Sequence, residues 1–153
     1  MTRKKEAVIC DIDGTAACDM PRWSAATNNT NKLENVNWDI YFDENLLLND
    51  KPIKEIKKIV LKYFSEGKQI IYLTGRHGKL LGVTKKWLKN NNFPIGIVLM
   101  RENDDYENIF NFKTSKIKEV LKKYNVVFAL GDLPDDKAAY DSFGISNFIV
   151  KGG

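Results

Sequence analysis

Short apolar runs alternate with apolar residues at helical spacing along most of this chain. The runs predict five strands, at residues 7–10, 69–73, 95–100, 126–130 and 146–150. Their composition is typical of strands buried on both faces of a parallel sheet. Helical spacing predicts four intervening helices, which begin at Lys51-Pro52, near Leu80, after Asn111 and near Ala138. The pattern predicts a doubly wound, Rossmann-like α/β domain, with a mainly parallel five-stranded sheet and helices on both faces.

Residues 16–50 interrupt this alternation. A structureless loop of that length is uncommon in a compact domain, so we expect a small insert over one edge of the sheet, partly helical around residues 38–42. The length of 153 residues fits one domain. We therefore expect a single domain over residues 1–153, in which residues 16–50 form a cap-like insert too short for an independent cap domain.

Polar residues follow four of the predicted strands at the point where each strand ends. They are Asp11 and Asp13 after the first strand, Thr74 and Arg76 after the second, Arg101 after the third and Asp132 after the fourth. Because parallel strands bring their carboxyl ends to one edge, we expect these side chains to converge. Hard carboxylate oxygens suit Mg²⁺, while cations and hydrogen-bond donors hold phosphoryl oxygens. The pattern favours a site for a divalent metal and a phosphate.

Asp11 and Asp13 are one residue apart, and the Gly14-Thr15 turn follows them directly. Like charges this close repel each other unless a cation lies between them. The alternative is a strand that ends in an Asp-Gly turn with hydrated carboxylates. Asp-x-Asp alone does not decide between the two, but the other polar strand ends favour the metal site.

The order of these motifs resembles the haloacid dehalogenase (HAD) superfamily of phosphatases over nearly the whole chain. The matching residues are Asp11-Ile12-Asp13-Gly14-Thr15, Thr74 after an apolar strand, Lys113 before a helix, and Gly131-Asp132-Leu133-Pro134-Asp135-Asp136. The resemblance implies a HAD fold with only a small insert in place of a cap domain. It also implies Mg²⁺-dependent hydrolysis of a phosphomonoester.

Within the superfamily the chain is most similar to the 3′-phosphatase domain of bacteriophage-type polynucleotide kinase. The shared features are Trp38-Asp39-Ile40-Tyr41-Phe42, Leu73-Thr74-Gly75-Arg76, Leu99-Met100-Arg101 and the spacing from Arg101 to Lys113. The sequence contains no Gly-x-x-x-x-Gly-Lys-Ser/Thr phosphate loop, so the resemblance covers the phosphatase half alone. Gly131 departs from the second aspartate that these phosphatases tend to carry.

The resemblance also implies roles for individual residues. Asp11 is expected to attack phosphorus and form an aspartyl-phosphate, and Asp13 to act as general acid and then general base. Thr74 and Lys113 are expected to hold the transferring phosphoryl group. Lys116 competes with Lys113 for this role.

The metal expected from the resemblance is Mg²⁺, held by the Asp11 carboxylate, the Asp13 backbone carbonyl and Asp132. Asp136 is expected to orient the lysine or the metal shell. The expected substrate-binding residues are Thr15, Gly75, Arg76 and Arg101.

Several of these residues have a simpler interpretation. Thr74-Gly75 could merely end a strand, and Arg76 and Arg101 could be surface charges, although arginine suits bidentate phosphate binding. His77 is expected to be a loop residue rather than a catalyst. The aromatic residues Trp38, Tyr41 and Phe42 are expected to pack the insert over the sheet, with stacking on nucleobases as the alternative.

The net charge of +4 and the pI near 8.9 permit an anionic partner such as nucleic acid without establishing one. Many of the lysines fall on predicted helix faces, where a solvated surface explains most of them. No apolar run approaches a membrane span, and we expect no signal peptide, because only a strand's worth of apolar residues follows the basic amino terminus. We therefore expect a cytoplasmic protein with no membrane partner.

We expect an enzyme that removes 3′-phosphate from DNA or RNA ends, with a separate kinase or ligase as a candidate partner. An uncapped site leaves room for a polymer. The first alternative is a phosphatase of a small molecule, such as a nucleotide or sugar phosphate. The second is a binding module that keeps the fold without catalysis.

Overall fold

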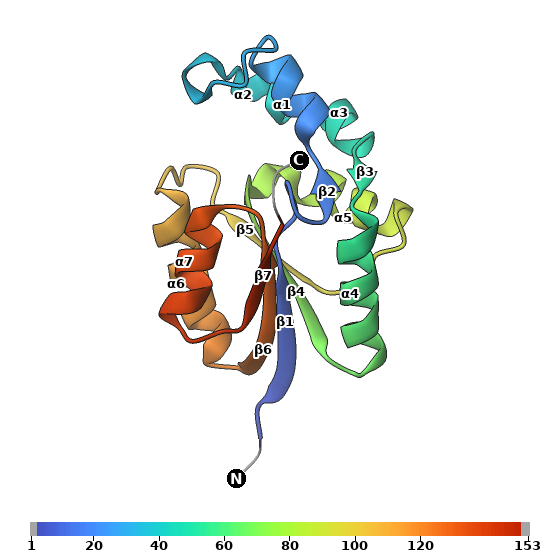
Figure 1. Cartoon of the computed structure of the whole chain (residues 1–153), viewed down its shortest axis with the longest axis vertical. Helices are drawn as coiled ribbons and strands as arrows, with labels where there is room; N and C mark the ends of the chain where they lie inside the picture. Colours follow the sequence, from blue (N-terminus) through green and yellow to red (C-terminus); the bar gives the residue numbers. More distant parts are fainter. Residues whose placement is uncertain (1–2, 151–153) are drawn as a thin grey trace.

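The computed structural model describes residues 3–150 and contains the predicted five-stranded sheet. Its strands are β1 (Lys5–Cys10), β4 (Gln69–His77), β5 (Ile97–Arg101), β6 (Tyr124–Gly131) and β7 (Asn147–Ile149). They lie in the order β5-β4-β1-β6-β7, and every pair of neighbours is parallel. Strand β1 is therefore central, which places its carboxyl end in the middle of the sheet edge (Figure 1).

Two helices cover each face of the sheet. They are α4 (Lys54–Ser65) and α5 (Leu81–Asn90) on one face, and α6 (Ile109–Leu121) and α7 (Pro134–Ser142) on the other. Side chains of β1 alternate between the two cores, with Val8 and Cys10 towards α4 and α5, and Ala7 and Ile9 towards α6 and α7. All four are completely buried. This confirms the doubly wound arrangement with helices on both faces.

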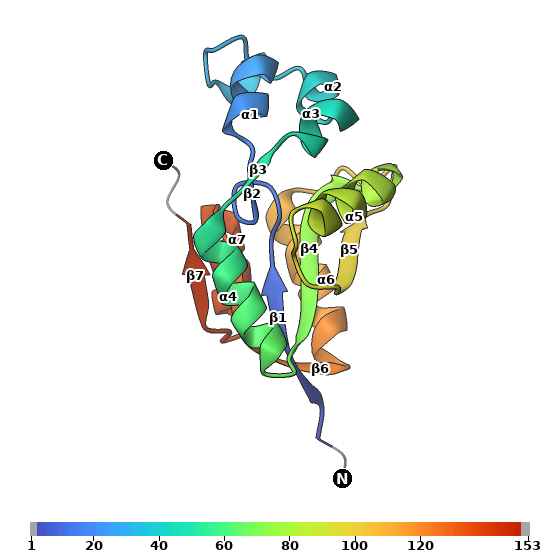
Figure 2. The ribbon, with the colours of Figure 1, turned by 90° about the vertical axis from the view of Figure 1, so that its right-hand side faces the viewer.

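The insert between β1 and α4 lies above the carboxyl end of the sheet (Figure 2). It consists of α1 (Met20–Ala26), the 3-10 helix η1 (Leu33–Asn35), α2 (Trp38–Tyr41) and α3 (Glu44–Leu48). The short antiparallel pair of β2 (Ala17–Cys18) and β3 (Lys51–Pro52) joins it to the sheet. Leu47 of the insert is completely buried against Leu80 and Val83. This contact fixes the insert to the side of the molecule that carries η2 (Gly78–Leu80) and α5.

Two predicted boundaries in the first half of the chain were wrong. Lys51 and Pro52 do not begin a helix, because they pair with β2, and α4 starts only at Lys54. The second strand does not end at Leu73 but continues to His77, which pairs with Arg101 of β5 after a shift of register. The residues of the Thr-Gly-Arg motif therefore lie within β4 and not after it, and His77 is a strand residue.

In the second half of the chain, α6 begins earlier than predicted. The Asn108 side chain accepts a hydrogen bond of 2.8 Å from the backbone N–H of Asn111 and caps the helix. Lys113 therefore lies inside α6 rather than before it, and β6 begins at Tyr124. None of the helices within residues 3–150 is long and apolar enough to cross a membrane.

We expect Leu47→Ala to lower the free energy of unfolding by about 2–5 kcal/mol, because it leaves a cavity between the insert and α5. Equilibrium denaturation in urea measures this change. Leu33→Ala makes the same substitution at a side chain of the insert that is 70% exposed, and it should change stability by less than about 0.5 kcal/mol. Equal stability of the two variants would contradict an insert anchored through Leu47.

Candidate active site

A tight turn after β1 holds Asp11 and Asp13 at the carboxyl edge of the sheet. The N–H of Asp11 donates to the carbonyl of Leu130 in β6 at 3.0 Å, and the N–H of Ala17 donates back to the carbonyl of Ile12 at 2.9 Å. The chain thus reverses within a few residues. Only 5% of the Asp11 surface is exposed, so the hydrated Asp-Gly turn does not describe this stretch.

Three carboxylates from distant parts of the chain meet beside this turn. Asp11, Asp132 and Asp136 each offer an oxygen within 4.8 Å of the others. The ammonium group of Lys113 lies among them, 3.2 Å from Asp11 Oδ1 and 2.6 Å from Asp136 Oδ1. Thr15 Oγ1 donates to the second oxygen of Asp11 at 3.2 Å. Both Asp11 oxygens therefore have a defined partner.

Asp136 connects Lys113 to the loop that carries Asp132. While its Oδ1 pairs with the lysine, its Oδ2 accepts hydrogen bonds from the backbone N–H groups of Asp132 (3.0 Å) and Leu133 (3.2 Å). A Cβ atom at Gly131 would lie 2.7 Å from the Cβ of Asp136. Glycine at the position that departs from the polynucleotide-kinase pattern thus leaves room for Asp136.

The electrostatics of this cluster fit a divalent cation. Burial, together with the nearby Asp136, raises the pKa of Asp11 to about 6 even though Lys113 opposes the shift. Burial and the neighbouring Asp11 raise the pKa of Asp132 to about 10. Both shifts mean that this site disfavours two carboxylate charges, and a bound cation would relieve that repulsion.

The position of Asp132 supports the same conclusion. Its Oδ1 is buried and has no hydrogen-bond partner among residues 3–150. Its Oδ2 would lie 2.0 Å from a Cβ atom at Gly14, whose φ of +80° also favours glycine. Asp11 and Asp132 thus offer hard oxygen donors of the kind that Mg²⁺ prefers.

Lys113, and not Lys116, reaches the carboxylates. Its side chain is almost completely buried; burial opposes its charge, but Asp11 and Asp136 raise its pKa above the usual range. Lys116 lies 4.0 Å from Glu119 on the same helix. The helical periodicity of α6 separates the two lysines, since Phe112, Lys113, Ile117 and Val120 form its buried face.

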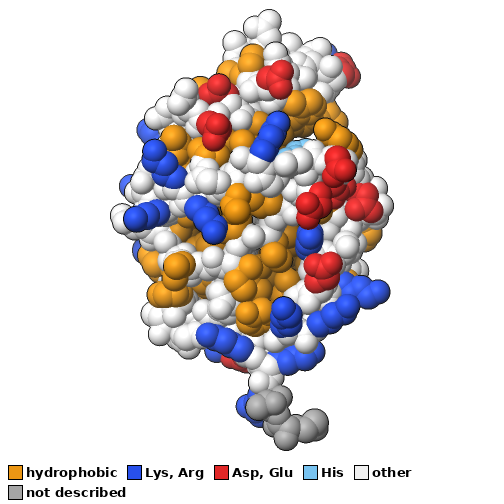
Figure 3. Space-filling model, turned by 180° about the vertical axis from the view of Figure 1, so that it is seen from behind, with side chains coloured by type: hydrophobic (Ala, Val, Ile, Leu, Met, Phe, Trp, Pro, Cys, Tyr) orange, Lys and Arg blue, Asp and Glu red, His pale blue; other side chains and the backbone are white. Residues whose placement is uncertain are grey.

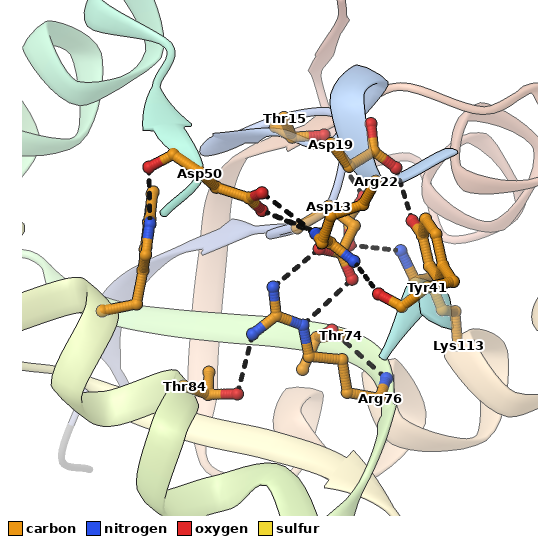
Figure 4. A network of polar contacts seen from close by, with 12 residues as sticks. Asp13, Thr15, Asp19, Arg22, Tyr41, Asp50, Thr74, Arg76, Thr84 and Lys113 are labelled. Atoms are coloured by element: carbon orange, nitrogen blue, oxygen red, sulfur yellow. Dashed lines mark hydrogen bonds and ion pairs between the residues drawn. The ribbon is translucent and has the colours of Figure 1, made fainter. Parts of the chain in front are cut away.

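A second polar network surrounds the carboxylate of Asp13 (Figure 4). Arg22 Nη2 lies 2.5 Å from Asp13 Oδ1, and Arg76 donates to both Asp13 oxygens, at 2.7 and 3.0 Å. Burial opposes the charged form, but the two guanidinium groups dominate and hold the pKa of Asp13 well below its usual range. Asp13 is therefore a carboxylate in this arrangement.

Arg22 connects the insert to this network. From α1 it also donates to both oxygens of Asp50, at 2.8 to 3.0 Å, and to the backbone carbonyl of Tyr41 at 2.6 Å. Only 2% of Arg22 is exposed. The insert thus supplies a buried cation to the site and does not merely cover it.

Sequence reasoning missed both Arg22 and Asp50. Two features of the sequence could have indicated Arg22. It is the one lysine or arginine between Glu6 and Asn31, and it lies among small and apolar residues of a helix. Asp50 carried no comparable signal, because it follows a helix and precedes Lys51 as an ordinary turn residue would.

The remaining predicted site residues lie beside the two networks. Thr74 is buried, and its hydroxyl accepts a hydrogen bond of 3.3 Å from the backbone N–H of Arg76. The Arg76 side chain is committed to Asp13 and, at 2.9 Å, to the hydroxyl of Thr84. Arg101 donates to the carbonyls of Gly75 (3.0 Å) and Glu107 (2.6 Å). Arg76 and Arg101 thus both have protein partners.

The aromatic residues of the insert pack against one another. Tyr41 is buried, the guanidinium of Arg22 lies 4.5 Å from its ring centroid, and its hydroxyl donates to Asp19. Trp38 stacks on Phe42 with ring centroids 6.0 Å apart and remains half exposed. Packing therefore accounts for Tyr41 and Phe42, while one face of Trp38 stays open to solvent.

The fold and this cluster define a phosphatase of the HAD type. The family model described as HAD superfamily, subfamily IIIB (acid phosphatase) matches residues 1–149. The chain belongs to this family, which confirms the resemblance to the HAD phosphatases and the prediction of an enzyme. A comparison with curated proteins gave no match.

Several solved structures share the fold. A chain in the structure of a Pnkp1/Rnl/Hen1 complex is 23% identical with a TM-score of 0.78, and the alignment covers 100% of this chain and 48% of that one. The class C acid phosphatase from Bacillus anthracis is 21% identical with a TM-score of 0.74, with coverage of 98% and 67%. A hydrolase from Streptococcus pneumoniae TIGR4 is 13% identical with a TM-score of 0.65, with coverage of 99% and 95%. The chain thus spans about half the length of the Pnkp1-complex chains that it matches.

We expect Arg22→Met to lower the free energy of unfolding by about 3–5 kcal/mol, because it removes the guanidinium that Asp13 and Asp50 share in a buried site. Chemical denaturation measures the loss. Lys137→Met removes an exposed cation 3.1 Å from Asp141 and should leave stability unchanged. If Arg22→Met lost no more stability than this control, Arg22 would not hold the insert to the sheet.

Proposed function

We propose that this chain is a Mg²⁺-dependent phosphomonoesterase that removes 3′-phosphate from nucleic-acid ends through an aspartyl-phosphate. The observation that carries the catalytic part is the buried ion-pair cluster at the end of β1, where Asp11 lies 3.2 Å from Lys113 and within 4.8 Å of a donor oxygen of Asp132. A nucleophile, a phosphate-binding cation and a metal-binding carboxylate lie within one site.

Asp11 acts as the nucleophile in this proposal. One of its oxygens attacks phosphorus, the bond from phosphorus to the leaving oxygen breaks, and an aspartyl-phosphate forms. Lys113 and Thr74 hold the phosphoryl oxygens, and Thr15 keeps the Asp11 carboxylate in place through its hydrogen bond of 3.2 Å. Positioning and charge stabilisation supply most of the catalysis in phosphoryl transfer.

Asp13 acts as the general acid and general base in this proposal. Held by Arg22 and Arg76 it is a carboxylate, ready to take a proton from the water that hydrolyses the aspartyl-phosphate. Donation to the leaving oxygen in the first step requires the protonated form, which the two guanidinium groups disfavour. Asp13 must therefore separate from at least one of them before it acts as an acid. Arg22 and Arg76 are positioning residues in this scheme.

Asp11, Asp132 and the backbone carbonyl of Asp13 are the proposed Mg²⁺ ligands, with Asp136 supporting Lys113 and the Asp132 loop. When bound, Mg²⁺ would neutralise charge between the carboxylate and the incoming phosphate. In its absence burial and the neighbouring carboxylates favour a protonated group in the Asp11–Asp132 pair, as the raised pKa values of both residues indicate.

The substrate part of the proposal rests on similarity. The Trp38–Phe42, Leu73–Arg76 and Leu99–Arg101 motifs resemble polynucleotide 3′-phosphatases, and one structural neighbour belongs to a Pnkp1/Rnl/Hen1 RNA repair complex. That neighbour is part of an assembly, which supports a separate kinase or ligase as a partner here. The second candidate is a small-molecule phosphatase, which the family model and the acid phosphatase neighbour favour.

We expect Asp11→Asn to abolish hydrolysis of an aryl phosphate in Mg²⁺ buffer, because an amide oxygen does not form the covalent intermediate. Circular dichroism should show an unchanged fold. Asp39→Asn removes an exposed carboxylate of the insert and should retain full activity. Turnover by Asp11→Asn would exclude Asp11 as the nucleophile.

We expect phosphate release from a 3′-phosphorylated oligonucleotide in Mg²⁺ and none after chelation by EDTA. A 5′-phosphorylated oligonucleotide and a nucleoside 3′-monophosphate are the comparison substrates, and malachite green detects the phosphate. Selective release from the oligonucleotide 3′ end supports end repair. Efficient release from the mononucleotide alone would exclude the polymer substrate and favour the small-molecule candidate, and full activity in EDTA would exclude the metal.

A further inference from the structure

Charged side chains are distributed unevenly between the two ends of the molecule. The insert, residues 16–50, contains six acidic and two basic residues, and residues 102–107 contain four acidic and no basic ones. These segments surround the carboxyl edge of the sheet, where the candidate active site lies. These two segments are therefore acidic, although exposed Lys51, Lys54 and Lys79 also lie near this edge and the chain as a whole carries a net charge of +4.

Basic side chains gather at the opposite end, where β1, β4 and β6 begin. We call this surface the amino edge and define it by Arg3, Lys4, Lys5, Lys62, Lys68, Lys118, Lys122 and Lys123. Pairing of Lys5 with Tyr124 and of Ala7 with Gln69 brings the three strand starts together. Figure 3 shows a group of Lys and Arg side chains at this end, with others further up the same face, while Asp and Glu side chains lie mainly over the upper half.

Few acidic residues neutralise the amino edge. Three lie near it, namely Glu6, Glu66 and Glu119. Glu6 is paired with Lys68, and Glu119 lies 4.0 Å from Lys116. Arg3, Lys5, Lys122 and Lys123 are all exposed. A compact cationic surface thus remains open to solvent.

Two open hollows flank the start of β1 on this surface. One, of about 870 Å³, is lined by Arg3, Lys4, Glu6, Leu121, Tyr124 and Asn125. The other, of about 350 Å³, lies on the far side of Lys5 and is lined in part by Phe64, Lys68 and Ile95. Phe64 is 43% and Ile95 86% exposed. Each hollow therefore combines cationic side chains with an aromatic ring, from Tyr124 or Phe64.

We propose that the amino edge is a binding surface for single-stranded nucleic acid, separate from the active site. Lysine and arginine side chains attract the phosphodiester backbone, and Tyr124 and Phe64 offer rings on which bases can stack. The insert and residues 102–107 offer the backbone no comparable attraction, so the charge distribution favours the amino edge for the body of a strand. The amino edge would bind the same class of ligand as the proposed active site, but none of its residues belongs to that site.

The test is fluorescence anisotropy with the full chain and a labelled 20-nucleotide DNA strand that carries a 3′-hydroxyl and no phosphate at either end. We expect saturable binding that weakens as salt rises, because bound phosphates release counterions. Replacing Lys5, Lys122 and Lys123 together by alanine should weaken binding roughly tenfold at low salt and reduce the salt slope by about 2.

The matched control replaces Lys85, Lys86 and Lys89 of α5 by alanine, which removes the same charge from another exposed face. It should change affinity less than about twofold. The circular dichroism spectra of both variants should be unchanged, which shows that they are folded. The strand carries no terminal phosphate that the enzyme could remove. The binding measured by anisotropy would therefore not change if the proposed phosphatase activity were absent.

Three results would overturn the proposal: no saturable binding, equal losses in both variants, or binding to vesicles that contain phosphatidylserine with no binding to the strand. Equal losses would mean that net charge and not the amino edge attracts the strand. Binding to vesicles alone would make this end a membrane-facing surface.

Discussion

Cations from α6, β4 and the insert neutralise the carboxylates that gather at the end of β1. Asp11, Asp13, Asp132 and Asp136 gather where the central strand ends, and charges this close and this poorly hydrated repel one another. Lys113 from α6 pairs with Asp11 and Asp136, and Arg76 from β4 pairs with Asp13. The sheet edge can therefore form only when both flanking elements deliver their cations.

The same constraint explains the insert. Asp13 needs a second cation, and Arg22 reaches it from α1 while Asp50 and the carbonyl of Tyr41 hold the guanidinium. Asp50 also accepts, through its backbone carbonyl, a hydrogen bond of 2.9 Å from the Trp87 indole of α5. One connected network thus joins the active-site turn, the insert and α5. The insert therefore supplies one of the two cations that keep Asp13 charged.

The charge distribution separates two tasks. Arg22, Arg76 and Lys113 are committed to carboxylates of the site, and the insert and residues 102–107 are mainly acidic. A dense group of exposed lysines lies at the far end of the sheet. The net charge of +4 does not reveal this uneven distribution. A sum over the chain does not show which charged residues the fold brings to the amino edge and which to the carboxyl edge.

Local patterns in the amino-acid sequence were sufficient to predict the fold class and to identify the central carboxylates. A continuous apolar run that ends in Asp11-Ile12-Asp13-Gly14-Thr15 specifies a buried parallel strand and its turn, because burial and turn geometry depend on neighbouring residues. Tertiary structure alone decided that Lys113 and not Lys116 reaches Asp11, that Arg76 is committed to Asp13, and that Arg22 and Asp50 belong to the site. These contacts join residues far apart in the chain, and helical phase, strand extension and the docking of the insert fix them together.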